Sequence, residues 1–243
     1  MSVRARGLLT IGLLAMAAGF ARLGVWQVHR LRERRIANAA ALEARSAPVL
    51  LLVGPSGGTD LLGRRVRARG RYDHTHDIIL RGREYRGVPG VEIVSPLLFE
   101  DTATAVLVNR GFVPTPDAVT VYPDSLREPG ERRVEGIALP LAPGGGAPLK
   151  RGGWTSWARL DLMALRDSLP YPISALYIRQ SPDSMLPRFP RRLEPPVLDD
   201  GPHLSYAIQW FAFAIMAVVF AGIVLMQGRE REQPKSVSGE EHA

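Results

Sequence analysis

The side chains with the clearest chemical potential gather at the start of the last apolar segment. His203, Tyr206 and Trp210 stand three and seven residues apart, so a helix would place them on one face. The dipole at a helix N-terminus disfavours a charged imidazole, which leaves a ring-nitrogen lone pair free to bind a metal. The alternatives are an interfacial histidine that merely begins the helix, and an ordinary interfacial belt of aromatic residues. The spacing therefore predicts a candidate binding site, with these alternatives open.

This segment also predicts a membrane-spanning helix. Residues 203–226 contain no Asp, Glu, Lys or Arg, and Leu204 to Met226 would form about 34 Å of helix, enough to cross the hydrocarbon core. A second apolar run covers residues 8–28 and is interrupted only by Arg22, whose side chain could snorkel toward the headgroups. A cleaved signal peptide is the alternative for this run. Its length, and Trp26 near its end, favour an uncleaved helix.

The charges around the second run set the predicted orientation. Basic residues flank both ends of the first run, whereas Asp199 and Asp200 precede the second run and Arg229 and Arg231 follow it. The excess of basic residues on cytoplasmic loops then places both termini in the cytoplasm and the middle of the chain in the periplasm. No transit-like segment precedes the first run, which favours a bacterial inner (cytoplasmic) membrane over an organelle. The predicted parts are a cytoplasmic N-terminus (1–7), transmembrane helices (8–28 and 203–226), a periplasmic domain with its linkers (29–202) and a cytoplasmic tail (227–243).

Composition excludes several functional classes. The net charge is +7, but residues 46–198 hold 20 basic and 16 acidic side chains, a mixed surface without the basic stripe that nucleic-acid binding needs. The chain has no cysteine, which excludes disulfides, thiolate metal sites and cysteine nucleophiles. The sequence contains no serine nucleophile elbow, phosphate-binding loop or HExxH motif, so we predict a protein that is not an enzyme.

The middle of the chain predicts a β-dominated (α+β) domain, a small antiparallel barrel or sandwich. A charged helix over residues 30–46 continues out of the first apolar run. In residues 65–72, arginines alternate with apolar or small residues, which indicates a strand with one buried face. Further strands are expected, and the amphipathic pattern of residues 159–168 predicts one helix. The expected strands are 64–72, 77–83, 91–98, 105–113, 133–139 and 175–180.

Two short polar motifs interrupt these elements. Asn109, Arg110 and Gly111 follow an apolar strand and precede Pro114, a composition typical of a turn. The segment from Asp73 to Asp77 contains two histidines in a His-x-His pattern, which could bind zinc or copper. No third ligand is evident nearby in the sequence, so a solvated hairpin tip is the preferred interpretation.

Three residues near the end of the first helix lie at the same depth in the membrane as the start of the second helix, close to the outer face of the bilayer. Gln27 could bridge the two helices by a hydrogen bond, and Trp26 is an interfacial anchor. Arg30 could bind a carboxylate through its planar guanidinium. With basic neighbours at positions 32, 34 and 35, Arg30 could equally belong to a solvated basic face.

Three blocks of sequence resemble the surfeit-locus-1 family of cytochrome c oxidase assembly factors. The first is LGVWQVHRL at residues 23–31, like the family's Leu-Gly-x-Trp-Gln-x-x-Arg. The second runs from Arg81 to VLVNRGFVP at residues 106–114, where Phe112 stands in place of the usual Trp. The third is HLSYAIQWF at residues 203–211, like the family's His-x-x-Tyr-Ala-x-Gln-Trp, with Pro202 replacing a common Asn before it.

This resemblance implies a role in building haem-a-type cytochrome c oxidase, near the step where haem a enters subunit I. It implies His203 as a candidate haem-iron ligand, Tyr206 and Trp210 beside the porphyrin, and Arg30 on its propionates, with Trp26 and Gln27 at the same level. Within the shared block of Asn109, Arg110 and Gly111, Arg110 would orient the domain over the membrane site. Subunit I, the lipid bilayer and, as a further candidate, haem a synthase are the implied partners. The alternatives are a scaffold for apo-oxidase that binds no haem, and a membrane-tethered periplasmic enzyme.

Overall fold

The computed structural model describes residues 2–54, 59–100, 103–141, 143–144, 148–151 and 154–230. Contacts divide the chain into two compact units. A helical unit combines Met1–Ala39 with Asp199–Ala243, and a β-rich unit contains Ala40–Leu198. Most of the predicted tail, residues 231–243, lies outside the described residues.

The helical unit is built from α3 (His203–Glu230) and from α1 (Val3–Ser46) as far as Ala39. Both are long and apolar enough to cross a membrane. The charged continuation predicted for residues 30–46 is confirmed, because α1 runs unbroken to Ser46, shortly before Pro48. Helix α3 begins at the predicted residue, directly after Pro202, which suits a first turn because it lacks an N–H.

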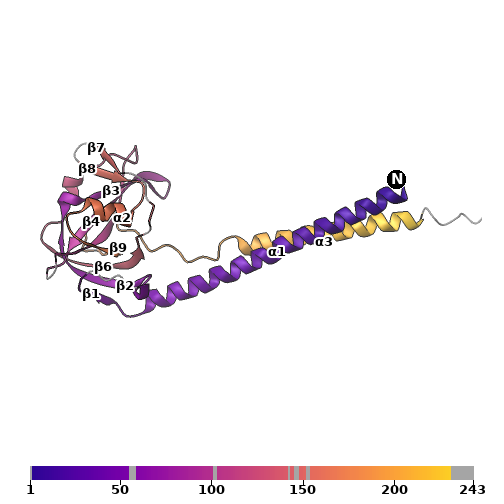
Figure 1. Ribbon diagram of the computed structural model, residues 1–243, viewed down its shortest axis with the longest axis horizontal. Coiled ribbons are helices and arrows are strands. Elements are labelled where there is room, and N and C mark those ends of the chain that lie inside the picture. The colour runs from indigo at the N-terminus through magenta and orange to yellow at the C-terminus, as the bar shows by residue number, and fades with distance from the viewer. Residues whose placement is uncertain are drawn as a thin grey trace, which may run out of the picture. The chain divides into compact units, whose positions relative to one another are not determined.

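Small residues form the contact between α1 and α3, which run side by side (Figure 1). Buried positions recur every seven residues on both helices, the spacing of a packed helix pair. A side chain at Gly24 would place its Cβ 2.7 Å from the Phe211 ring, so the aromatic ring needs the glycine. Close approach through small side chains is the usual way that helices associate in membranes. The seven-residue series are Thr10, Ala17, Gly24 and Leu31 on α1, and Ala207, Ala214 and Ala221 on α3.

The β-rich unit is a barrel, the first of the two predicted alternatives (Figure 1). The sheet order is β1-β2-β6-β9-β5-β4-β3-β8-β7, and an additional β2–β4 pairing closes β2, β6, β9, β5 and β4 into a ring. The strands are β1 (Leu50–Leu52), β2 (Arg65–Tyr72), β3 (Ile78–Tyr85), β4 (Val88–Leu98), β5 (Ala105–Pro114), β6 (Glu131–Pro140), β7 (Leu149–Arg151), β8 (Trp154–Trp157) and β9 (Ile173–Gln180). Short helices η1 (Thr59–Leu61), η2 (His74–His76), η3 (Pro123–Leu126) and α2 (Leu162–Ser168) connect them.

The expected antiparallel sheet is only partly right. Strand β9 lies parallel to β5, β8 parallel to β3, and β1 parallel to β2. Parallel neighbours need long connections, and β9 reaches β5 only after η3, β6, β7, β8 and α2 have intervened. Strands β1, β7 and β8 are additions to the predicted set.

Strand β2 shows how the sequence builds the barrel wall. Its even-numbered residues, 66 to 72, point into the core, and its four arginines face outward, as the alternation predicts. Gly70 is required on the inner face, because a Cβ there would lie 2.0 Å from the Leu98 carbonyl oxygen. Helix α2 starts three residues later than expected because Asp161 caps it, accepting hydrogen bonds from the amides of Met163 and Ala164.

Candidate functional site

The first residue of α3, His203, forms a hydrogen bond with a buried polar side chain of α1. His203 Nδ1 lies 2.8 Å from Gln27 Oε1, and Gln27 is 8% exposed. An amide oxygen only accepts hydrogen bonds, so Nδ1 carries the ring proton. Nε2 is then the ring nitrogen left to bind a metal, and the ring orientation is fixed by the other helix. This arrangement has the features of a metal-ligating histidine with its supporting partner.

Small-molecule sites are commonly clefts of roughly 300–1,000 Å³. A hollow of ≈ 500 Å³ opens beside His203. Charged side chains dominate its wall, and several are already paired. Arg30 Nη1 donates to Glu33 Oε2 at 2.7 Å, and both side chains are more than half exposed. Exposed pairs of this kind contribute little energy, so Arg30 can exchange Glu33 for another carboxylate. The lining residues are Arg30, Glu33, Arg34, Ala37, Asp199, Gly201, Pro202 and His203.

The segment before α3 is tied to α1 by polar contacts that the sequence did not indicate. Arg35 Nε donates to Asp200 Oδ2 at 2.8 Å. The Asp199 carbonyl oxygen accepts from Asn38 Nδ2 at 2.7 Å and from Arg34 Nε at 3.2 Å. These contacts hold the start of α3, and with it His203, against α1. Two of the contacting residues, Arg34 and Asp199, also line the hollow.

The predicted aromatic residues do not join this hollow. Trp210 instead stacks on Phe20 of α1, with ring centroids 5.7 Å apart and an interplanar angle of 28°, and contacts Phe213 edge-on. Tyr206 is 45% exposed and Trp26 is 53% exposed. The structure thus brings together His203, Gln27 and Arg30, and leaves Tyr206, Trp26 and Trp210 outside the lining of the hollow. Phe20 was missed because an isolated phenylalanine in an apolar helix carries no distinguishing signal.

The prediction of a turn at residues 109–111 is wrong, because all three residues lie inside β5. The pairing of β5 with β4 shifts register between Ile93 and Val94, a bulge that accounts for the turn-like composition. Gly111 has φ +116°, and a Cβ there would lie 2.1 Å from the Arg191 carbonyl oxygen. Asn109 Oδ1 accepts from the Gly111 amide at 3.0 Å, which stabilises the irregular backbone.

Arg110 is completely buried in a charged cluster in the barrel unit. Its Nη2 donates to Glu128 Oε1 at 2.7 Å, and Arg192 Nη2 donates to the same oxygen at 2.5 Å. Burial raises the pKa of the Glu128 carboxyl, but the two guanidinium groups outweigh burial and hold that pKa below its usual range. The cluster joins β5, the segment after η3 and the segment that leads to α3. Arg110 therefore has a structural place in the barrel, and its expected role of orienting the domain stays a prediction.

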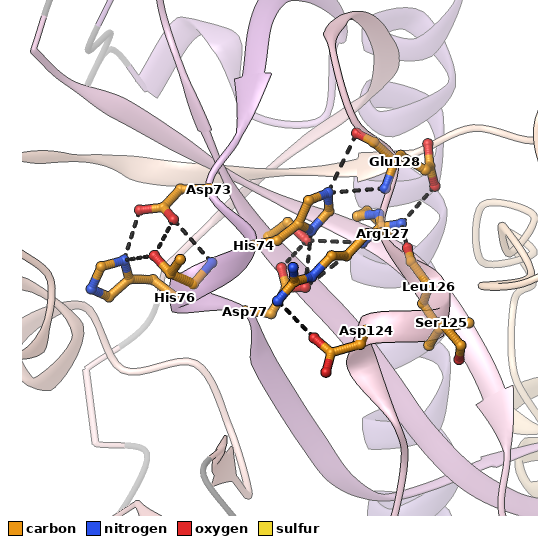
Figure 2. A network of polar contacts seen from close by, with 12 residues as sticks. Asp73, His74, His76, Asp77, Asp124, Ser125, Leu126, Arg127 and Glu128 are labelled. Atoms are coloured by element: carbon orange, nitrogen blue, oxygen red, sulfur yellow. Dashed lines mark hydrogen bonds and ion pairs between the residues drawn. The ribbon is translucent and has the colours of Figure 1, made fainter.

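The segment from Asp73 to Asp77 is not a solvated hairpin tip. Figure 2 shows His74 between Asp77 and Glu128, with hydrogen bonds from Nδ1 to Asp77 Oδ2 at 3.0 Å and from the Glu128 amide to Nε2 at 3.0 Å. The side chains of His74 and Asp77 are only 10% and 4% exposed. Each histidine is therefore hydrogen-bonded to a carboxylate, because His76 Nδ1 also lies 2.7 Å from Asp73 Oδ2. Within the described ranges, no group of three or more His, Asp or Glu side chains could hold a metal ion.

The barrel should lose stability in acid. Burial raises the pKa of Asp73, but hydrogen bonds from Thr75, Tyr171 and His76 outweigh burial and lower that pKa to about 2; the pKa of Glu128 is also lowered. A carboxyl whose pKa is depressed in the folded state contributes stability above its ordinary pKa and loses it as pH falls. Thermal unfolding should therefore shift to lower temperature between about pH 5 and pH 2. Asp73→Asn should make this dependence shallower, and an unchanged dependence would contradict the assigned role.

Comparison with known proteins assigns the chain to a family. The SURF1 family model matches residues 14–215. The chain belongs to the SURF1 family. Its relatives include a SURF1-like protein of Monosiga brevicollis, 25% identical over 86% of this chain and 84% of that protein. The Surfeit locus protein 1 of Rattus norvegicus is 28% identical over 82% of this chain and 70% of its own length. An uncharacterised SURF1-like protein of Mycobacterium tuberculosis is 27% identical over 89% and 83% of the two chains.

The region matched to the SURF1 family includes both the helical site and the barrel cluster. Gln27 and His203 lie within residues 14–215, as do Arg110 and Glu128. The resemblance drawn from the three sequence blocks is thereby confirmed.

Proposed function

We propose that this SURF1-family protein is a membrane-bound assembly factor for haem-a-type cytochrome c oxidase. In this proposal it holds haem a as cargo at His203 and hands it over during insertion into subunit I, with haem a synthase as the further candidate partner. The observation that carries the proposal is the 2.8 Å contact between His203 Nδ1 and Gln27 Oε1. Family membership supports the class of function.

The residues at the hollow fit a haem in their chemistry. Because Nδ1 of His203 is hydrogen-bonded to Gln27 Oε1, Nε2 is the ring nitrogen that would ligate haem iron. Arg30 lines the same hollow and can leave an exposed glutamate for a propionate. When bound, haem a supplies an iron centre that accepts the Nε2 lone pair. The chain's residues orient that nitrogen, neutralise negative charge and release the cargo.

A transfer protein should bind its cargo with moderate affinity. In the part of the hollow that the structure describes, His203 is the only lining residue with a side chain that commonly ligates haem iron. With one ligating side chain in this lining, haem a would be held so that a receiving protein could take it over. We place the site at the outer face of a bacterial inner membrane, with both termini cytoplasmic and the barrel periplasmic.

An experiment in cells separates a haem carrier from a haem-free scaffold. Cells that depend on this protein for oxidase assembly would express either the wild type or His203→Ala at equal levels. The carrier account predicts that His203→Ala membranes contain subunit I but that their oxidase haem a falls to about the level of cells lacking the protein. Haem a content is measured by pyridine haemochrome spectra of purified oxidase. Wild-type haem content in the His203→Ala strain would support the scaffold and reject the carrier.

A further inference from the structure

The charged side chain of Arg22 on α1 has no ion-pair partner among the described residues of the helical unit. Arg22 is the only charged residue of the run from Leu8 to Val28 and lies six residues, about 9 Å of helix, before the end of that run. Its side chain is exposed on the helix pair, and no described residue forms an ion pair or hydrogen bond with it. An ionisable residue at such a depth in a membrane helix is costly unless it has a partner.

Arg22 points away from α3. Gly24 and Gln27 mark the face of α1 that is buried against α3. At about 100° per residue, Arg22 lies roughly 200° from Gly24, on the opposite face. Trp26 follows one turn later on this outer face and is 53% exposed. Helix α3 therefore cannot supply the missing counter-charge.

Lipid headgroups are a poor partner for Arg22. Side chains of a helix lean toward its N-terminus, and for Arg22 that direction leads deeper into the apolar run rather than to the nearer end at Val28. The Trp26 side chain leans the same way and covers the turn between Arg22 and that end. To reach the nearer headgroups, the Arg22 side chain would have to turn away from its usual N-terminal direction and pass the Trp26 ring.

We propose that the outer face of α1 docks on a transmembrane helix of a different protein, one that presents an aspartate or glutamate to Arg22. A second copy of this chain cannot serve, because neither residues 8–28 nor residues 204–226 contain an acidic residue. Gly19, one turn before Arg22, is open to this approach, since a Cβ there would meet nothing within 4 Å. The inference rests on the proposed function, in which the factor acts on a membrane-embedded oxidase.

The test converts the expected ion pair into a covalent bond. Arg22→Lys keeps the charge and introduces a primary amine, and a hydrophobic carbodiimide added to native membranes activates carboxyl groups within the bilayer. An activated carboxyl in contact with this amine forms an amide. The background is low because the only lysines, Lys150 and Lys235, lie outside both apolar runs. Leu23→Lys, with the amine about 100° around the helix, and Arg22→Leu are the matched controls.

We expect an adduct between full-length Arg22→Lys and a second, different protein, at least tenfold more abundant than in either control. Mass spectrometry should place the linked acidic residue within an apolar segment of that protein. Absence of a protein adduct, as a lipid-phosphate partner would give, overturns the proposal, as does equal labelling of Leu23→Lys or an adduct at twice the mass of this chain. The haem content of purified Arg22→Leu should equal that of the wild type, so loss of docking and loss of haem binding are distinguishable.

Discussion

Glu128→Gln should lower the free energy of unfolding of the barrel by about 3–5 kcal/mol, the usual cost of removing one partner from a buried ion pair. Glu128 Oε1 accepts from both Arg110 and Arg192. Arg110 is fully buried and Arg192 is 7% exposed, so the substitution removes the carboxylate that the two guanidinium groups share. Arg110 then has only the more distant Asp77 Oδ2, 4.0 Å from its Nη1, as a buried counter-charge. The neutral amide retains the size of the side chain, which isolates the loss of charge.

Urea unfolding of the full-length protein in detergent, followed by tryptophan fluorescence, would measure this loss. Trp157 is 2% exposed and should report the opening of the barrel. Glu131→Gln is the matched control, because Glu131 pairs with Arg69 on the outer surface and should change stability by less than about 1 kcal/mol. Equal effects of the two substitutions would show that the buried cluster is not a main source of stability.

His203→Ala should weaken haem a binding by at least about a hundredfold, because it removes the proposed iron ligand itself. Gln27→Leu should weaken binding by roughly 10–100-fold, the effect typical of losing the group that orients a metal-binding histidine. Gln27→Glu should retain most of the affinity, because a carboxylate or carboxyl oxygen can still accept the proton on Nδ1.

Anaerobic titration of haem a into each purified full-length variant would rank these affinities. The expected order is wild type and Gln27→Glu, then Gln27→Leu, then His203→Ala. Equal affinities of Gln27→Leu and the wild type would remove the proposed role of the 2.8 Å contact. Retention of full affinity by His203→Ala would show that His203 does not ligate the haem iron.

Local patterns in the sequence were enough to predict the two long helices, α2 and six of the described strands, but not β1, β7 or β8. The alternation in residues 65–72 specifies a strand with one buried face, and the two apolar runs specify helices by length and composition. The order of strands in the sheet was not predictable. The parallel pairing of β5 with β9 depends on contacts across more than sixty residues, for which no local pattern exists.

For the candidate site, too, local spacing was informative and contacts between distant residues were not predictable. Spacing within one helix relates His203 to Tyr206, but the contact of His203 with Gln27 joins positions 176 residues apart. The sequence suggested only that Gln27 could bridge the helices. Asn109 and Gly111 have the composition of a turn, which led to the wrong prediction for this block. The burial of Arg110 was not predictable, because Glu128 and Arg192, which form the charged cluster with it, come from distant segments of the chain. Charged pairs inside a core are uncommon enough that an isolated arginine is expected at the surface.

Haem a binding at His203 is best tested by the reduced optical spectrum of the full-length wild-type protein, purified in detergent from a host that makes haem a. The account predicts a haem a spectrum with up to one haem per chain, and loss of that spectrum in His203→Ala purified in parallel. A folded wild-type protein that carries no haem, from membranes in which haem a is demonstrably present, would contradict it.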